Sequence, residues 1–562
     1  MTNRALVIGS GPGGSIAAMV LAERHWDVTV FEKGRNYFDD LTSLKPKTLF
    51  SNDELKMDRY FVMPDPEAEP RVFRAGPNGT SMKGVVQSLP QTVGGGTVHW
   101  DAKTPRFWDI DFQKLSLLGP IEGADISDWP FSYDEIAPFY EEVEALIGVA
   151  GDIGQIPPHP TLAHAPRTRD LPMPAGPPMY SSLLAAKGCE AMGLHPFLVP
   201  MAINSEPHDG RPACNNCGFC AGYGCPIMAR VGSLAPLREA LLAGAEIRPE
   251  SNVVAINFSG TKVAGIEWID SAGARHVESG DLIVLAANAI ESPRLALMSA
   301  LPDPDDTIGR DVMFHWFTYG SGIFLDERLH GLRGRSLTHD LDDFADPDFP
   351  GARAAAQTAG LPYFRGGTLE MGGSQFPIDE ASTYQEVLGV VAPDAPYGVA
   401  FKQLMRDSLL GDRLLGIIMF GEDLPYAANR VDLDPTVKDW RGMPVARVTY
   451  APGSHELAAQ SFYIPRLTEI LKAAGAGVAF SVSQLPSKRS SISEDTVPDT
   501  DHLMGGMRMG SDPTTSVTDE NGRYHRLDNL FVSDGSLFPS GGAHNPTLTI
   551  MATALRNARQ WA

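Results

Sequence analysis

The hydrophobic positions at the start of the chain predict a strand, a tight turn, a helix and a second strand. Ala5 to Ile8 is a short apolar run, and six residues dominated by glycine follow it. Ser15 to Arg24 has the composition of a helix, and Val28 to Phe31 is apolar again and ends at Glu32. This order predicts a βαβ unit, in which two parallel strands are connected through a helix.

A second apolar run, far along the chain, predicts another strand of the same sheet. Residues 281–288 are almost continuously apolar, as expected of a strand buried on both faces, and a helical pattern follows at residues 289–294. Because the two runs are distant in the sequence, a sheet that contains both implies a discontinuous domain.

The region from residue 310 to residue 493 alternates short strand-like runs with helical ones. Residues 429–435 and 445–450 alternate apolar and polar positions in the period of a strand, and residues 455–474 have the pattern of an amphipathic helix. We expect a second domain in which helices pack on a largely antiparallel sheet.

The predicted fold is therefore α/β, with a discontinuous Rossmann-like dinucleotide-binding domain beside an α+β substrate-binding domain. We assign residues 1–128, 229–310 and 494–562 to the first domain. Residues 129–228 and 311–493 are assigned to the second, which includes a cysteine-rich loop at residues 214–225.

Composition narrows the function classes. The chain has 562 residues, of which 43% are hydrophobic and 20% charged, as in ordinary multidomain enzymes. Its net charge of -23 argues against a nucleic-acid partner and against an anionic membrane surface, which attract clustered Lys and Arg. No window approaches the roughly 18 apolar residues of a membrane span, and the N-terminus enters a strand directly. We expect a cytoplasmic chain without membrane insertion, unless a partner subunit carries it out of the cell.

The glycine-rich turn carries the first chemical signal. In Gly9-x-Gly11-x-x-Gly14 the glycines let the backbone approach a pyrophosphate at the positive end of a helix. Glu32, at the end of the next strand, is placed to accept hydrogen bonds from the adenosine ribose. NAD and FAD share this pattern, so the turn alone predicts a dinucleotide without choosing between them.

The C-terminal region carries the second signal, a histidine and an asparagine. His502 has the side chain best matched to accept a hydroxyl proton near neutral pH, and Asn545 supplies a neutral donor for a substrate oxygen. Asn545 is also predicted to cap a helix that begins at Pro546, whose positive end would stabilise negative charge. We expect no catalytic role for the neighbouring His544. Taken singly, His502 and Asn545 are equally compatible with structural roles.

Four of the five cysteines fall in one short loop. Cys214, Cys217, Cys220 and Cys225 have the spacing C-x2-C-x2-C-x4-C-P, one residue longer than a bacterial ferredoxin pattern. An iron–sulfur cluster, a zinc site, a group of reduced thiols and an internal disulfide all remain open on this spacing.

Several motifs together resemble the glucose-methanol-choline (GMC) flavin oxidoreductase family. They are the opening glycine turn with Glu32, the segment 93–100 (Val-Gly-Gly-Gly-Thr-Val-His-Trp), the segment 129–140, and Asn545-Pro-Thr-Leu-Thr. The chain is most similar to the branch that contains pyranose oxidase and the gluconate, fructose and glucose dehydrogenase flavoproteins. The motifs extend from one end of the chain to the other.

The resemblance implies FAD as cofactor and a set of residues that contact it: Gly9, Gly11, Gly14, Glu32, Gly94, Gly95, His99, Trp100, Asp534, Asn545 and Thr547. In pyranose oxidase the histidine that matches His99 is covalently bound to the flavin, although Asp101 stands here where that enzyme has threonine. In the related dehydrogenases a comparable cysteine loop holds a three-iron cluster that passes electrons to a cytochrome subunit.

The resemblance also implies the reaction, oxidation of a primary or secondary alcohol of a sugar, sugar acid or glycoside, with His502 as base and Asn545 as the oxygen partner. Dioxygen, a quinone or a redox partner subunit would then reoxidise the flavin. Aromatic residues between positions 340 and 412, such as Tyr363, Phe364, Tyr384 and Tyr397, either form a sugar pocket or pack within loops. The alternatives are a sterol, aromatic or other non-sugar alcohol as substrate, and a flavoprotein subunit without turnover.

Overall fold

The computed structural model describes most of the chain. The residues outside the description are 1–2, 48–63, 66, 85–88, 221–223, 332–333, 374–380, 382–383, 386–387, 390–396, 409, 484–499 and 562. The predicted domain boundary at residues 493 and 494 lies outside the described residues.

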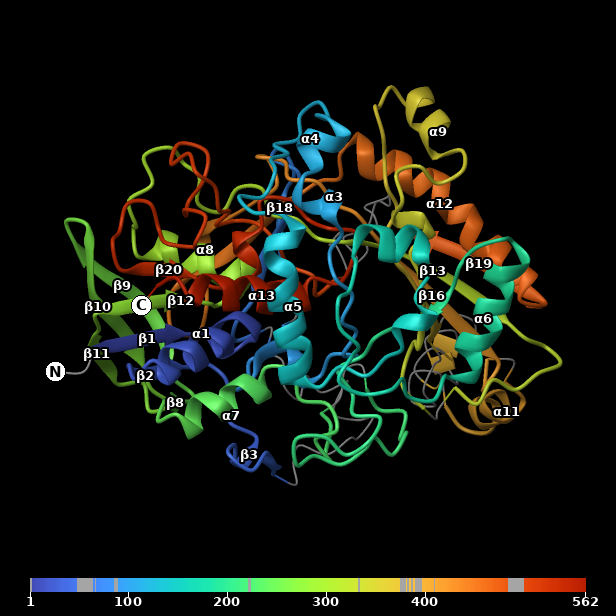
Figure 1. Cartoon of the computed structure of the whole chain (residues 1–562), viewed down its shortest axis with the longest axis horizontal. Coiled ribbons are helices and arrows are strands. Elements are labelled where there is room, and N and C mark those ends of the chain that lie inside the picture. Colours follow the sequence, from blue (N-terminus) through green and yellow to red (C-terminus); the bar gives the residue numbers. More distant parts are fainter. Residues whose placement is uncertain are drawn as a thin grey trace.

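A five-stranded parallel sheet occupies the end of the molecule where both termini lie (Figure 1). Its strands, in spatial order, are β20 (Leu530–Val532), β12 (Leu282–Leu285), β1 (Arg4–Ile8), β2 (Asp27–Phe31) and β8 (Glu246–Arg248). Helix α1 (Pro12–Glu23) packs against α13 (Thr547–Ala558) and α7 (Leu234–Leu242), and α5 (Tyr133–Ile147) packs on α13. The strands come from distant parts of the chain, which confirms the discontinuous Rossmann-like architecture.

A six-stranded sheet, antiparallel throughout, forms the opposite end of the molecule (Figure 1). The strands in spatial order are β19 (Val478–Ser483), β13 (Trp316–Ile323), β16 (Leu414–Gly421), β15 (Leu369–Gly373), β14 (His339–Leu341) and β7 (Phe197–Leu198). Helix α12 (Ser454–Ala473) packs on β13 and β19, and α6 (Tyr180–Ala191) packs on β15. This end confirms the predicted α+β part with an antiparallel sheet.

A four-stranded sheet joins segments that were assigned to different domains. It contains β17 (Arg430–Lys438), β18 (Pro444–Tyr450), β5 (Arg71–Ala75) and β6 (Ser81–Gly84), with β18 and β5 paired in parallel. Strands from residues 1–128 and from residues 311–493 therefore lie in one sheet. The assignment of these two ranges to separate domains stays a prediction.

The remaining elements are short or lie at the edges. A three-stranded antiparallel sheet precedes β12, and a small hairpin follows β2. The elements are β9 (Asn252–Ser259), β10 (Lys262–Ile269), β11 (Arg275–Ser279), β3 (Phe38–Asp40), β4 (Lys45–Pro46), α3 (Asp109–Phe112), α4 (Lys114–Leu118), α8 (Asn288–Met298), α9 (Ala352–Thr358) and α11 (Val399–Asp407).

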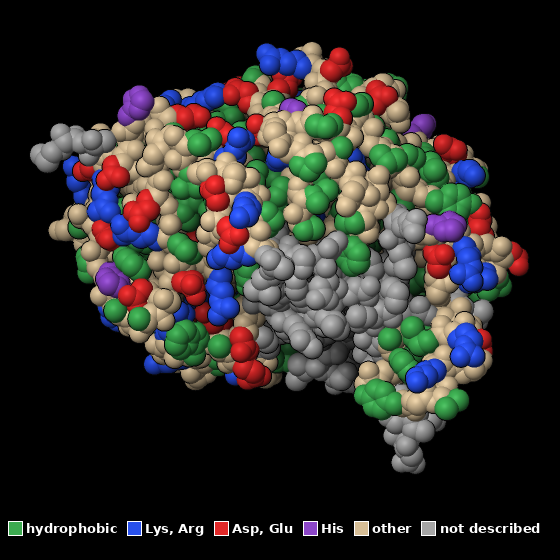
Figure 2. Space-filling view, turned by 90° about the horizontal axis from the view of Figure 1, so that it is seen from below, with side chains coloured by type: hydrophobic (Ala, Val, Ile, Leu, Met, Phe, Trp, Pro, Cys, Tyr) green, Lys and Arg blue, Asp and Glu red, His purple; other side chains and the backbone are tan. Residues whose placement is uncertain are grey.

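The surface carries charges of both signs. On the face shown in Figure 2, Lys and Arg side chains alternate with Asp and Glu over the coloured part of the molecule. Among the described residues, no helix is both long enough and apolar enough to cross a membrane.

Candidate active site

One large cavity, of about 670 Å³, lies at the carboxyl ends of the parallel strands. Gly9, Glu32 and Ala286 line it at the ends of β1, β2 and β12. His502 and Asn545 line the same cavity, and Phe317, Ile418 and Phe420 from the antiparallel sheet form an apolar wall. Most of the predicted nucleotide-binding residues therefore share one cavity with the two predicted reaction residues.

The glycine-rich turn is packed so closely that side chains would not fit at most of its positions. A Cβ on Gly9 would lie 2.3 Å from the Ala286 carbonyl oxygen, and one on Gly13 would lie 1.6 Å from the Ser533 carbonyl oxygen. A Cβ on Gly14 would lie 2.1 Å from the Gly9 carbonyl oxygen, so this glycine serves helix packing and does not line the cavity. Glycine removes these clashes, which lets α1 approach the sheet.

Gly11 differs from the other glycines of the turn. A Cβ built on Gly11 has no described protein atom within 4 Å, and the residue lines the cavity at the N-cap of α1. Its freedom from side-chain atoms leaves room for a ligand next to the first N–H groups of the helix. This arrangement fits the pyrophosphate of a dinucleotide.

Glu32 is held firmly at the end of β2. Its carboxylate accepts hydrogen bonds from the Ser10 N–H (3.1 Å), the Ser10 hydroxyl (2.6 Å) and the Gly34 N–H (2.7 Å). Burial raises the pKa of this carboxyl, while the three donors act in the opposite direction. The glutamate lines the cavity, and its contact with an adenosine ribose stays a prediction.

The segment around His99 contributes further predicted contacts. Gly95, His99 and Trp100 line the cavity, whereas Gly94 lies behind its wall, where an added Cβ would meet Val98 and Leu234. His99 is buried, and its Nε2 has no hydrogen-bond partner among the described residues. Burial lowers the pKa of His99 to about 4, so the ring is neutral near pH 7. A buried ring nitrogen at the wall fits direct contact with a cofactor.

The remaining predicted contacts, Asp534 and Thr547, come from the C-terminal part of the chain. Thr547, at the first position of α13, lines the cavity. Asp534 also lines it and accepts hydrogen bonds from the Asn288 N–H (2.9 Å) and the Ser536 N–H (2.9 Å). Gly9, Gly11, Glu32, His99, Asp534 and Thr547 thus line one cavity, and the chemistry of these residues fits FAD.

His502 and Asn545 meet directly in the cavity. The Asn545 amide nitrogen donates to His502 Nε2 at 3.2 Å and to Glu370 Oε1 at 3.1 Å, so both of its hydrogens are used. The Asn545 Oδ1 has no partner among the described residues. Burial lowers the pKa of His502 well below its usual value, and His315 beside it acts in the same direction. His502 is therefore a neutral base near pH 7.

Two groups near this pair were not identified from the sequence. His315 Nδ1 lies 2.8 Å from His502 Nδ1, and His315 Nε2 lies 2.8 Å from the Gly542 carbonyl oxygen. Glu370 forms a buried cluster with Lys103, whose Nζ lies 2.8 Å from Glu370 Oε2 and 2.7 Å from Asp340 Oδ1. In the sequence, His315 is an isolated histidine and Glu370 is a charged residue within an apolar strand, and these were the only signals of the two groups.

The Lys103 cluster is unusual because it contains two carboxyl groups and one ammonium group. Burial raises the pKa of Asp340 to about 7 and that of Glu370 well above its usual value, while Lys103 acts in the opposite direction. Glu370 Oε1 accepts one N–H of the Asn545 amide, whose other N–H donates to His502, so Glu370 helps to orient this amide toward the base.

One expectation about the residues next to α13 is corrected. The prediction that Asn545 caps α13 is wrong: the helix begins at Thr547 with Pro546 at its N-cap, and no side-chain capping bond forms. The Asn545 amide is occupied by His502 and Glu370 instead. His544 does not line the cavity; it is buried against Trp108, with Nε2 3.4 Å from Asp342.

Of the four aromatic residues named between positions 340 and 412, Tyr363 and Phe364 pack within the core, whereas Tyr397 is exposed. Tyr363 and Phe364 are buried in the core beneath α12. Neither they nor Tyr384 and Tyr397 line the cavity.

The cysteine loop surrounds a separate, small space. Cys214, Cys217, Cys220 and Cys225 line a cavity of about 20 Å³, and they are present as thiols. Burial raises the pKa of the Cys220 thiol to about 11. Within the described ranges, which omit residues 221–223, no three His, Cys, Asp or Glu side chains are arranged to hold a metal ion. The arrangement does not fit an iron–sulfur cluster, and we derive no electron-transfer step through this loop.

Comparison with known proteins identifies the family of this fold. Two family models, both described as GMC oxidoreductase, match residues 126–317 and 425–554. The 2-methyl-1,2-propanediol dehydrogenase of Mycolicibacterium austroafricanum is 30% identical over 98% of this chain and 93% of its own. The gluconate 2-dehydrogenase flavoprotein of Pantoea cypripedii is 26% identical over 99% and 92% of the two chains.

Solved structures agree on the fold. The crystal structure of pyridoxine 4-oxidase from Mesorbium loti superposes with a TM-score of 0.59 and 18% identity, covering 100% of this chain and 99% of the other. At this level of identity the likeness extends to the fold alone.

Proposed function

The chain belongs to the GMC oxidoreductase family and is an FAD-dependent enzyme acting on CH–OH groups, and from this premise we propose that it oxidises a primary or secondary alcohol of a sugar, sugar acid or glycoside. The observation that carries the proposal is the contact between His502 and Asn545 at the wall of the large cavity. A neutral imidazole with its Nε2 lone pair at this wall is placed to take a hydroxyl proton.

The chain's own residues supply the proton chemistry. A substrate hydroxyl that enters between His502 and Asn545 donates its proton to His502 Nε2, and the Asn545 amide donates a hydrogen bond to the same oxygen. Glu370 keeps this amide oriented through the second N–H. FAD, when bound, supplies the two-electron acceptor for the hydride that leaves the alcohol carbon.

The sugar-like substrate class is supported by the relatives and by the cavity. The relatives named above act, by their names, on a diol and on gluconate. Polar groups such as Asp101, His502 and Asn545 line the cavity beside the apolar wall of Phe317, Ile418 and Phe420, which suits a molecule with hydroxyl and C–H surfaces. Sterol or aromatic alcohols are the competing substrates, and a flavoprotein without turnover is the competing function.

Attachment of FAD to His99 and the electron acceptor are further parts of the proposal. His99 supports attachment because its Nε2 is buried at the cavity wall without a partner among the described residues. Acid precipitation of the holoenzyme tests it: yellow colour in the pellet supports a covalent bond, and colour in the supernatant excludes one. Assays with dioxygen, a quinone and a cytochrome identify the acceptor.

Anaerobic spectroscopy tests the substrate class. The purified yellow enzyme is mixed with gluconate, glucose, a 1,2-diol, benzyl alcohol or a sterol, and the flavin absorbance is followed. Bleaching by the polyols before the aromatic alcohol or sterol supports the proposal. Bleaching by the sterol or benzyl alcohol alone replaces the substrate class, and a spectrum unchanged by every alcohol indicates a protein without turnover.

A further inference from the structure

The hydrogen bonds of His315 determine which nitrogen of His502 carries a proton. A carbonyl oxygen can only accept, so the bond to Gly542 (2.8 Å) places a hydrogen on His315 Nε2. His315 is fully buried, and burial lowers its pKa to about 4, so the ring is neutral and its Nδ1 is an acceptor. His502 Nδ1, 2.8 Å away, must then be the donor.

The consequence for His502 follows from imidazole chemistry. A neutral ring with a hydrogen on Nδ1 has its lone pair on Nε2, and Nε2 is the nitrogen that faces Asn545. We propose that His315 is a positioning residue that holds His502 in the tautomer whose Nε2 accepts the substrate proton. This inference rests on the proposed function.

The residues on both sides of His315 are fixed by one buried segment. The Phe314 N–H donates to the Asp423 carboxylate (2.6 Å), and the Trp316 indole N–H donates to the Glu422 carbonyl oxygen (2.7 Å). His315 therefore has little freedom to turn away from His502. The same segment continues into a charged network.

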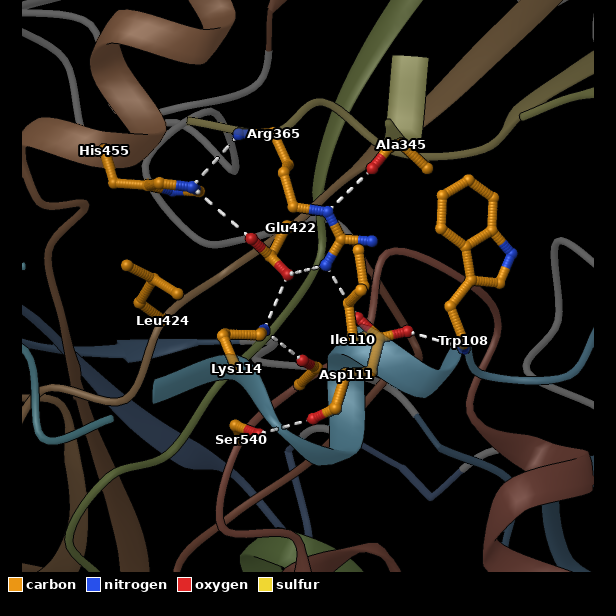
Figure 3. A network of polar contacts seen from close by, with 12 residues as sticks. Trp108, Ile110, Asp111, Lys114, Ala345, Arg365, Glu422, Leu424, His455 and Ser540 are labelled. Atoms are coloured by element: carbon orange, nitrogen blue, oxygen red, sulfur yellow. Dashed lines mark hydrogen bonds and ion pairs between the residues drawn. The ribbon is translucent and has the colours of Figure 1, made fainter. Parts of the chain in front are cut away.

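That network also holds the turn that contains Gly542. Lys114 donates to Glu422 Oε1 (2.6 Å), as Figure 3 shows, and also to the Gly541 carbonyl oxygen (2.5 Å). Arg365 bridges Glu422 and Asp111 at 2.7 Å each. These four charged side chains are fully buried and sum to zero net charge, so the network is internally paired. It holds the turn that contains the acceptor of His315 and the segment that contacts both neighbours of His315.

The proton balance assigns His315 the role of a hydrogen-bond acceptor for His502 and not that of a relay that passes the proton on. The hydroxyl O–H bond breaks and an N–H bond forms at His502 Nε2, which makes His502 an imidazolium. Its Nδ1–H continues to donate to His315, so the new charge gains a hydrogen-bond partner without a second transfer. His315 does not pass the proton on, because its Nε2–H remains bonded to the Gly542 carbonyl.

Two substitutions separate positioning from packing. His315→Leu removes the acceptor, and His315→Gln keeps it, since an amide donates to one carbonyl and accepts from one N–H. In anaerobic stopped-flow reduction of the holoenzyme, we expect His315→Leu to lower the limiting rate about 100-fold with substrate affinity nearly unchanged. His315→Gln should retain the rate to within about 10-fold of the wild type. Thr318→Val, in the strand β13 that follows His315 and also buried, is the control and should not change the rate.

The outcomes are distinguishable from failure of the proposed function. A wild type reduced by no alcohol contradicts the proposed function itself. If the wild type is reduced by an alcohol and His315→Leu is reduced at the same rate, the positioning role alone is contradicted. The same holds if the Leu and Gln variants are slowed by the same factor. Should the Leu variant not retain FAD, His315→Met replaces it in the same comparison.

Discussion

The two ends of the large cavity are built in different ways. At the nucleotide end the wall includes the backbone of the glycine turn, where Gly9 and Gly13 leave no room for a Cβ. At the reaction end the wall is made of side chains, His502 and Asn545, joined by hydrogen bonds to His315 and Glu370. The first end depends on the absence of atoms, and the second depends on the orientation of rings and amides. Substitutions should therefore change binding at one end and rate at the other.

The largest effect is expected from two glycines of the turn. Gly13→Ala places a methyl group against the Ser533 carbonyl and should destabilise the fold by about 3 kcal/mol or more, with loss of FAD. Gly11→Ala meets no described protein atom, so the protein should fold with wild-type stability but bind FAD weakly. Thermal unfolding of the apoprotein and FAD titration measure the two effects. If Gly11→Ala binds FAD with wild-type affinity, FAD does not lie against this glycine.

Asn545→Ala tests the reaction end. Removal of a donor to the developing oxygen charge should slow flavin reduction by about 100-fold or more while FAD stays bound. Rapid-mixing kinetics under nitrogen measures this rate. Asn521→Ala, near the C-terminal end of α13 and away from the cavity, is a matched control that should leave it unchanged. Loss of FAD in the Asn545 variant with a normal rate per bound flavin would reassign this residue to the nucleotide end.

The stability of the reaction end should depend on pH. Burial lowers the pKa of both His99 and His315 to about 4, below the ordinary value near 6.5 that applies to the unfolded chain. Between about pH 6.5 and 4 the unfolded state binds more protons, so stability falls as the pH falls, by up to about 3 kcal/mol for each histidine. Urea unfolding at pH 7 and pH 5 measures the change. The His315→Gln variant should show a shallower dependence, and an equally steep one would contradict the assignment.

The smallest effect is expected at the cysteine loop. None of its four cysteines lines the large cavity, so Cys217→Ser should change the rate of flavin reduction by less than about 2-fold. Reduction kinetics and iron analysis of the same preparations provide the test. A rate lowered together with loss of bound iron would show that the loop takes part in the reductive step.

The contrast between the two ends also explains what the sequence could reveal. The glycine turn and Glu32 lie within one βαβ unit, so their arrangement is encoded locally and was predicted correctly in outline. His502 and Asn545 were identified as individual residues, but the bond of His502 to His315 joins positions 187 residues apart. Such a contact leaves no periodicity in the sequence. The error at Asn545 has the same origin. Its local propensity is to cap a helix, but its side chain instead bonds to His502 and Glu370, which are distant in the sequence.

The central claim is that His502 removes the proton from a substrate alcohol. The most direct test is the anaerobic reduction rate of FAD in His502→Ala beside the wild type, with a polyol that bleaches the wild-type flavin. The account predicts an FAD-bound, yellow variant that is reduced about 100-fold to 10,000-fold more slowly. A variant reduced as fast as the wild type would contradict the assignment of His502 as the base.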